Sequence, residues 1–265
     1  MRIAASLEYD GQFFCGWQKQ PDVPTIQGAI ELALSDIAQS EITTSAAGRT
    51  DSGVHALGQT IHFDTDIIRP ISAWIKGVNS LLPKSIRVQW AKEVSDDFHS
   101  RHSAILREYQ YLLINSTINP AIFNSYAGWN FYPLKYDLVK MACTKLVGEH
   151  DFSSFRSSEC QSLSAIRNIH YFDVKQYNND YIFTMRANGF LHHQIRNMIA
   201  AIILIGREGK PLDFIDFLLT QKDRKLAPPT FMPNGLYLSN ITYDEKWGLP
   251  SSNNQLKFFG NSIGN

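Results

Sequence analysis

The sequence contains only three cysteines among 265 residues, and its net charge is zero. Cys15, Cys143 and Cys160 are widely spaced and form no CxxC or Cys/His pattern, which argues against a disulfide framework and against a structural zinc. A reducing cytoplasmic setting fits this usage. The 25 basic and 25 acidic residues exclude a uniformly basic nucleic-acid binder, but the sum does not exclude a local basic groove.

Long hydrophobic runs are also missing. The run after Ile3 ends at Glu8, and the most apolar later stretch, residues 195–205, contains Arg196 and is shorter than the ~20 residues of a membrane span. We therefore expect a soluble protein without membrane association. No internal repeat or low-complexity block stands out. Because 44% of the residues are hydrophobic, the chain can bury a substantial core and is not disordered throughout.

Hydrophobic periodicity predicts an α+β protein. A helix is expected after a cap at Thr25, with a buried stripe that begins at Ile26. A hairpin turn is expected at residues 177–180. The predicted strands are 2–9, 59–65, 86–94, 107–114, 167–176, 181–187 and 236–243, and the other predicted helices are 72–82, 134–147, 191–205 and one that starts near Pro211.

The order of these elements predicts two similar α/β halves. We expect a continuous, mixed and mostly antiparallel sheet flanked by helices, with an active-site cleft between the halves. Residues 1–114 would form the N-terminal half, and the aromatic, turn-rich segment 115–133 would connect it to a C-terminal half at 134–250. The Asn- and Ser-rich residues 251–265 would form a frayed tail.

The most informative stretch for chemistry is GRTDSGVHA at residues 48–56. Two glycines flank an arginine and a carboxylate, so the backbone of such a loop can approach a ligand closely. Asp51 could act as a nucleophile or a general base, and Arg49 could contact a phosphate or insert into a base stack. A tight turn, with Asp51 or Thr50 bonding local amides, explains the same residues, and composition alone favours that simpler interpretation.

Two other segments could complement this loop. Residues 98–113 read FHSRHSAILREYQYLL, in which Tyr109 and Tyr111 would share one face of a strand. Core packing is the simpler role for one of them, whereas a tyrosine can also stack on a base and relay a proton. Arg196 lies in an apolar helix, and a buried guanidinium there needs an anionic partner, for which Asp51 is a candidate.

The histidines form no convincing metal site. His192 and His193 are adjacent and would not share one helix face, and His55 and His62 have no evident third ligand. Structural or RNA-contacting roles are the simpler interpretation. Cys15 has no spacing that favours a nucleophile, so we expect a buried or incidental thiol.

Six motifs, in order along the chain, resemble the tRNA pseudouridine synthase A (TruA) family. They are EYDGQFFCGWQ (8–18), TIQGAIE (25–31), GRTDSGVHALGQ (48–59) with HFD (62–64), SRHSAILREYQY (100–111), FLHHQIRN (190–197) and APP…GLYL (227–238). This resemblance implies an isomerase that converts uridine to pseudouridine at tRNA positions 38, 39 and 40, in the anticodon stem-loop. It also implies a cytoplasmic homodimer that uses neither a cofactor nor a metal.

The resemblance assigns roles to individual residues. Asp51 would be the catalytic aspartate and nucleophile, and Tyr109 would stack on the target base and handle protons. Arg196 would pair with Asp51. Leu236 would pack under the uracil, and Arg49 would help to hold the flipped-out nucleotide.

Two positions depart from the family pattern. Ser52 stands where a small residue commonly follows the aspartate, which is a mild change. Asn234 precedes Gly235, where family members more often have an acidic residue, so the loop contacts at that point are expected to differ.

Two other functions fit parts of the pattern. A non-catalytic RNA-binding module also presents aromatic residues on paired α/β halves, but no RNP1-like string is present. A carboxylate-dependent hydrolase needs a second carboxylate or a metal cluster, and the only acids in nearby motifs are Glu108 and Asp64. For an isomerase, the sequence leaves open a covalent ribosyl intermediate, a glycal, or attack on the base.

A neutral chain that binds tRNA must gather its basic side chains. We expect several of the following to line one cleft: Arg2, Lys19, Arg101, Arg107, Arg156, Arg167 and Arg196. Phosphate contacts of this kind would make tRNA binding fall with added salt.

Overall fold

The computed structural model describes residues 1–250 and Leu256, and the chain divides into two compact units. The first unit is Met1–Leu106 together with the chain from Tyr237 onward, and the second is Arg107–Leu236. The expected connecting segment, residues 115–133, lies within the second unit. Apart from Leu256, the tail predicted at 251–265 lies outside the described residues.

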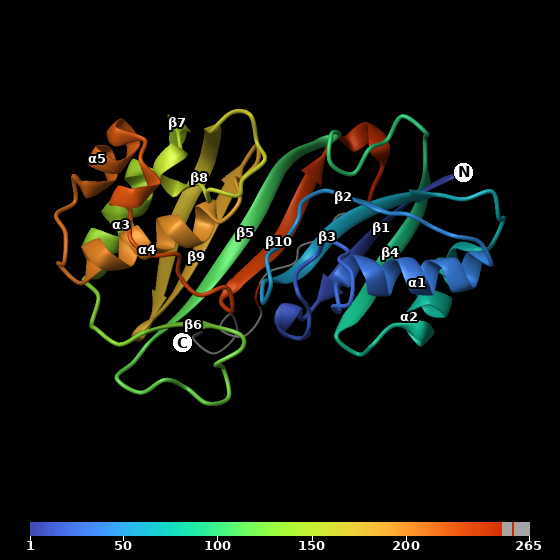
Figure 1. Ribbon diagram of the computed structural model, residues 1–265, viewed down its shortest axis with the longest axis horizontal. Helices are drawn as coiled ribbons and strands as arrows, with labels where there is room; N and C mark the ends of the chain where they lie inside the picture. The colour runs from blue at the N-terminus through green and yellow to red at the C-terminus, as the bar shows by residue number, and fades with distance from the viewer. Residues whose placement is uncertain (251–255, 257–265) are drawn as a thin grey trace, which may run out of the picture. The chain divides into compact units, whose positions relative to one another are not determined.

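The first unit has a sheet in the order β4-β1-β3-β10, with helices α1 and α2 on one side of it (Figure 1). Its elements are β1 (Arg2–Tyr9), α1 (Ile26–Ala38), β2 (Ser45–Ala46), β3 (His55–Asp64), a π-helical turn η2 (Ala73–Gly77), α2 (Val78–Leu81), β4 (Ile86–Val94) and β10 (Leu236–Tyr243). Strand β1 is antiparallel to both β3 and β4, whereas β10 runs parallel to β3. The last strand in sequence therefore belongs to the sheet that the first strand begins.

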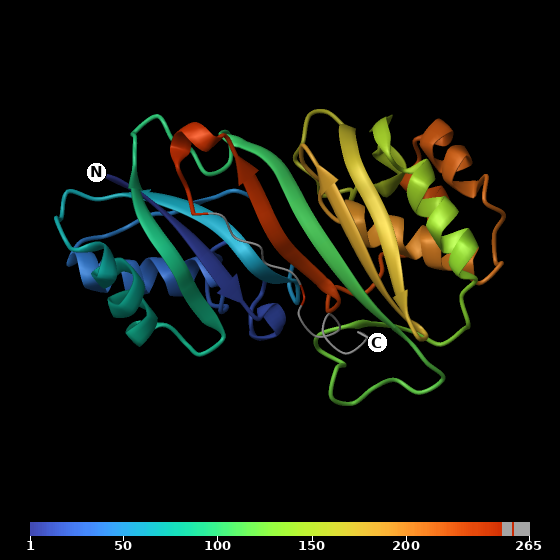
Figure 2. The same cartoon turned by 180° about the vertical axis from the view of Figure 1, so that it is seen from behind.

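The second unit has an antiparallel sheet in the order β5-β9-β8-β7, and helix α3 packs against β8 and against α4. Seen from behind, its strands lie in front of α4 (Figure 2). Its elements are β5 (Ala104–Asn115), β6 (Gly128–Asn130), α3 (Tyr136–Lys145), β7 (Gly148–Asp151), β8 (Ile166–Tyr177), β9 (Asp180–Ala187), α4 (Gln194–Gly206) and α5 (Phe214–Gln221). The short β6 adds a parallel pairing to β5.

The start of α1 follows from the residues around Thr25. Thr25 Oγ1 accepts a hydrogen bond from Gly28 N at 3.3 Å and so satisfies one of the free amides of the first turn. The helix buries the stripe that begins with Ile26 and Ile30. It also buries Glu31, whose carboxylate accepts the backbone N–H of Thr44 at 2.9 Å and so fixes the chain just before β2.

These observations confirm the α+β class and the mostly antiparallel pairing. Strands β1, β4 and β10 have the predicted bounds, and the hairpin turn lies between Tyr177 and Asp180 as expected. Four starts were predicted wrongly. Strand β5 begins at Ala104 rather than at residue 107, and α5 begins at Phe214 rather than near Pro211. Strand β3 begins at His55 rather than at residue 59, and α4 begins at Gln194 rather than at 191, because His193 has a left-handed backbone with φ 62°. No helix in the described residues combines the length and apolar character that a membrane span requires.

Candidate active site

The loop that carries Asp51 connects β2 to β3 in the first unit. We call residues 48–53 the aspartate loop. Asp51 itself is half-buried, Thr50 before it is buried, and Arg49 is exposed. The side chain of Arg49 has no hydrogen-bond or ion-pair partner among residues 1–250. The loop therefore presents an arginine outward while the following threonine points into the unit.

Buried neutral side chains and a backbone amide hold the aspartate loop. Gln59 Nε2 donates to the carbonyl of Gly48 at 2.5 Å, and the Tyr9 hydroxyl is 2.8 Å from Thr50 Oγ1. The backbone N–H of Trp17 donates to Thr50 O at 3.0 Å. These contacts come from β1, from β3 and from the segment after β1, so three parts of the first unit fix the residue next to Asp51.

Glycines allow the segment after β1 to lie directly against the aspartate loop. Gly16 has φ +82°, and a Cβ atom on it would lie 2.9 Å from Thr50 O. Ser52 Oγ donates to Phe14 O at 3.2 Å, which adds a contact on the other side of Asp51. Only glycine combines this backbone conformation with so close an approach. Residues 14–17 therefore clasp the loop, and we call them the clasp.

His55, which follows the aspartate loop, has a structural role in the first unit. It is buried, its ring stacks on Tyr237 with centroids 4.7 Å apart, and its Nδ1 accepts the N–H of Gly11 at 3.1 Å. The carboxylate of Asp10 lies 3.2 Å from the same nitrogen. The structural interpretation of His55 agrees with these contacts.

The two tyrosines of β5 have different surroundings. Tyr111 is fully buried, and its hydroxyl donates to Met232 O at 2.9 Å, so it is the core residue of the pair. Tyr109 retains 8% exposure, and its ring meets Phe190 edge to face with centroids 5.3 Å apart. An edge contact leaves the flat face of the Tyr109 ring to other neighbours.

Arg196 lies on the first turn of α4, and its side chain is fastened to a loop of the same unit. Its Nε donates to Phe231 O at 2.8 Å. That loop is held in turn by Arg224, which donates to Pro228 O at 2.9 Å and to the side chain of Asn197 at 3.1 Å. Asn197 is fully buried on α4. Arg224 thus links α4 to the loop that orients the guanidinium of Arg196.

Leu236 is buried at the start of β10, just after a glycine that permits close packing. A Cβ atom on Gly235 would lie 2.3 Å from Leu112 O, so no other residue fits there without a backbone shift. Asn234 donates from its side chain to Asn124 O at 3.1 Å. A carboxylate at this position could not donate that bond, which gives the departure from the family pattern a local physical role.

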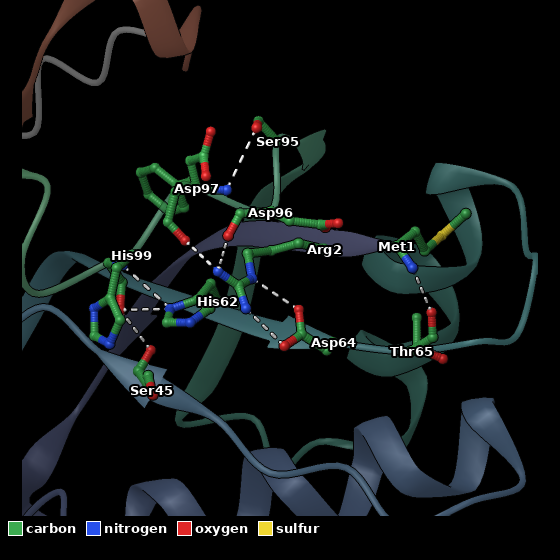
Figure 3. Close-up of polar contacts among 12 residues, drawn as sticks. Met1, Arg2, Ser45, His62, Asp64, Thr65, Ser95, Asp96, Asp97 and His99 are labelled. Atoms are coloured by element: carbon green, nitrogen blue, oxygen red, sulfur yellow. Dashed lines mark hydrogen bonds and ion pairs between the residues drawn. The ribbon is translucent and has the colours of Figure 1, made fainter.

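His62 and Arg2 belong to a polar cluster of the first unit that ties β1 and β3 to residues 95–103 (Figure 3). Arg2 binds both carboxylate oxygens of Asp64 at 2.8 Å and donates to Phe98 O at 2.8 Å. His62 Nδ1 accepts the N–H of Ser100 at 3.2 Å. Burial, together with the nearby His99 and Arg2, lowers the pKa of His62 to about 4, while Asp64 opposes this shift. His62 is therefore a neutral structural residue at pH 7.

The basic residues expected in a cleft are divided between the two units and have partners there. In the first unit, Arg2 is committed to Asp64, and Lys19 Nζ lies 3.3 Å from Glu31. In the second, Arg167 donates to Ser162 Oγ at 2.8 Å, and burial lowers its pKa, with a further contribution from the positive charge of Arg156. Arg107 donates to Asn188 O at 3.0 Å, and Arg101 is exposed.

The structure thus places Asp51 and Arg49 together in the first unit, and Tyr109, Arg196 and Leu236 in the second. Sequence analysis found these side chains but missed the residues that hold them. The buried groups behind Asp51 are Tyr9, Gly16 and Gln59, and the group behind Arg196 is Arg224. Tyr9, Gly16 and Gln59 lie in recognised motifs, and those motifs were the sequence signal that could have identified them. Arg224 lies in no motif.

Comparison with known proteins agrees with the motifs. A family model described as tRNA pseudouridine synthase matches residues 5–103 and 142–244. The tRNA pseudouridine synthase A of Nitrosomonas eutropha is 50% identical over 253 residues, covering 96% of this chain and 91% of that protein. The tRNA pseudouridine synthase A of Methylobacillus flagellatus is 48% identical over 257 residues, which cover 97% of this chain and 98% of that protein.

Among solved structures, a chain from the crystal structure of a Cbf5-Nop10-Gar1 complex is similar over 76% of this chain and 54% of that one. Its identity of 11% and TM-score of 0.34 are too low to establish a shared fold. The family model and the nearly full-length identity to the two bacterial proteins are sufficient without it. The chain belongs to the tRNA pseudouridine synthase A family.

Proposed function

We propose that this chain isomerises uridine to pseudouridine in tRNA, at positions 38, 39 and 40 of the anticodon stem-loop, with Asp51 as the catalytic carboxylate. Its relatives are named for pseudouridine formation in tRNA. The observation that supports the site is the aspartate loop, where a half-buried carboxylate lies on a backbone held by Gln59, Tyr9 and the clasp. Such fixed geometry is what a reaction at one sugar carbon requires.

The proposed reaction conserves every atom. The N1–C1′ bond breaks, the uracil turns, and a C5–C1′ bond forms; the proton leaves C5 and N1 gains one. Substrate and product therefore have the same composition, and the balance requires no oxidant or reductant. Aspartate carboxyl groups are ordinarily ionised at neutral pH. Asp51 would attack C1′ as a nucleophile; removal of a ribose proton on the route to a glycal and attack on the base are the other two ways in which a carboxylate can begin.

The uridine must leave its base stack before a carboxylate can reach its sugar. Unstacking costs a few kcal/mol, and less in a loop or at a stem end. Arg49 is exposed beside Asp51, and we propose that its guanidinium fills the space that the base vacates. In the second unit, Tyr109, Arg196 and Leu236 would bind the displaced nucleotide, the first by stacking and the last by packing under the uracil.

The direct test is Asp51→Asn, assayed on unmodified tRNA. The amide keeps the size of the side chain but loses its charge, so we expect pseudouridine formation to fall at least about 1,000-fold while the Kd for tRNA changes less than about threefold. Tritium release from C5-labelled uridine measures the reaction. The matched control is Asp36→Asn, an exposed acid on α1, which is expected to keep full activity.

The same assay separates the other candidate functions. A protein that only binds RNA would release no tritium in its unaltered form, and a hydrolase would give free uracil or cleaved RNA. Either result would refute the isomerase. Full activity of Asp51→Asn would agree with the isomerase activity but would show that Asp51 is not the catalytic residue.

We also propose that the protein acts as a homodimer in the cytoplasm, as the family resemblance implies. Light scattering during size-exclusion chromatography would give the mass in solution. A mass near the 30.1 kDa of one chain at assay concentrations would contradict the dimer. A dimer would appear at about twice that mass.

A further inference from the structure

Tyr9 stands out among the residues behind Asp51 because its hydroxyl lies deep in the first unit and meets the aspartate loop. The side chain is 2% exposed, and Thr50 is 7% exposed. Their oxygens are 2.8 Å apart. Tyr9 therefore connects β1 to the residue directly before Asp51.

The amide of Gln59 on β3 gives the aspartate loop a second buried contact. Its Nε2 donates to the Gly48 carbonyl at 2.5 Å, so the donor end of the amide faces the loop. In the Tyr9–Thr50 pair, either hydroxyl can donate the hydrogen bond. Burial raises the pKa of Tyr9, so the hydroxyl keeps its proton at every pH at which RNA is stable.

This orientation leaves a buried acceptor unused. Gln59 is fully buried, and its Oε1 has no hydrogen-bond partner among the described residues. Buried polar atoms are normally satisfied, and an unsatisfied one is destabilising. A flip of the amide would place Oε1 against Gly48 O and remove this donor from the loop. The fold thus keeps a costly arrangement in which the amide donor of Gln59 serves the aspartate loop.

We propose that Tyr9 is a positioning residue for catalysis: its hydroxyl fixes Thr50 and thereby sets the place of the Asp51 carboxylate. The proposal rests on the proposed function of Asp51 and adds the groups that orient it. Since a misplacement of about 1 Å at a reacting group can cost about 100-fold in rate, loss of this contact lowers kcat rather than substrate binding.

The test compares variants that remove one hydroxyl at a time. Tyr9→Phe keeps the ring and Thr50→Val keeps the shape, so each removes only the hydrogen bond. We expect kcat to fall about 10- to 100-fold in either variant, with the Kd for tRNA within about threefold of the unaltered protein. The double variant should be no worse than the single ones, because both break one chain. Thr50→Ser, which retains a hydroxyl, should recover most of the activity.

Tyr181→Phe is the matched control, because Tyr181 is as buried as Tyr9 and donates to Leu134 O at 3.2 Å in the second unit. It should lower the melting temperature about as much as Tyr9→Phe while leaving kcat unchanged. Unchanged kcat in Tyr9→Phe, or an equal fall in Tyr181→Phe, would overturn the positioning role. A fall in kcat in the double variant equal to the product of the two single falls would also overturn the positioning role.

Amide hydrogen exchange provides a readout that does not need turnover. In Tyr9→Phe, the amides of residues 48–53 should exchange at least about tenfold faster than in the unaltered protein, and in Tyr181→Phe they should not. If the unaltered protein forms no pseudouridine, the proposed function fails, while exchange still decides whether Tyr9 holds the loop. Unchanged exchange in Tyr9→Phe refutes the positioning role whatever the activity.

Discussion

The two units hold their functional side chains by different chemistry. Behind Asp51 in the first unit, the contacts come from an amide and a phenol, Gln59 and Tyr9, both uncharged. Behind Arg196 in the second unit, the contacts come from the guanidinium of Arg224, which donates only to neutral oxygens of its loop and of Asn197. Among residues 1–250, no carboxylate partners Arg224.

The difference between these two sets of contacts has a physical explanation. Uncharged donors can fix a carboxylate loop without neutralising the charge that is to react. An arginine that bonds only to carbonyl, amide and hydroxyl oxygens keeps its positive field, which favours a polyanion such as RNA. Burial lowers the pKa of Arg224, but a guanidinium starts so high that it stays charged at neutral pH. We therefore expect changes behind Asp51 to alter the rate, and changes behind Arg196 to alter stability.

Among the residues that hold the site, the largest effect is expected at the clasp. Gly16→Ala places a Cβ atom 2.9 Å from Thr50 O at φ +82°, so the loop must move. Activity on tRNA should fall at least about 100-fold. Gly248→Ala is the control, because Gly248 also has positive φ, +53°, but would meet only the flexible end of Lys92. Its activity should be normal; equal losses in both variants would show that backbone strain, not loop position, matters.

A smaller effect is expected behind Arg196. Arg224→Met fills the space but leaves the oxygens of Asn197 and Pro228 without a donor, so the free energy of unfolding should fall by about 2 kcal/mol. Chemical denaturation measures this. Arg186→Met, which removes an exposed ion pair with Glu108, should cost at most about 1 kcal/mol. If Arg224→Met kept its stability and lost only kcat, the contrast between the units would disappear.

The smallest effect is a pH dependence that belongs to the first unit. His62 has a pKa of about 4 when folded against an ordinary 6.5, so the unfolded chain binds more protons between these values. Stability should be complete above pH 6.5 and should fall by about 1–2 kcal/mol, after allowance for solvent screening, as the pH drops toward 4. His62→Asn keeps an acceptor for Ser100 N and should flatten this part of the curve.

Much of the fold could be predicted because local patterns determine it. The alternation in β1 and β4 and the cap at Thr25 are visible in short stretches of sequence. The start of β3 was missed because its first residues belong to the glycine-flanked motif and do not alternate. The two- and three-residue strands β2 and β6 are too short to leave a pattern, and they exist through pairing with distant strands.

The proposed reactive residues could be named from the sequence, but the residues that hold them could not. Asp51 and Arg49 lie in a motif whose two glycines indicate a loop, whereas Tyr9, although it lies in another motif, has the pattern of any buried strand residue. Its role depends on a contact with Thr50, 41 positions away. The same holds for Arg224, which is an ordinary basic residue until the fold brings it to α4. Contacts of this kind are set by tertiary structure and leave no local signal.

The return of β10 to the first unit has a consequence for synthesis on the ribosome. The second unit is continuous from Arg107 to Leu236, so a nascent chain can complete it as soon as those residues emerge. The first unit lacks its last strand until residues 237–243 have been made, which is after the whole second unit. Until then His55 and Ala56 of β3 lack their partners on β10, so the first unit is the later of the two to complete its pairing.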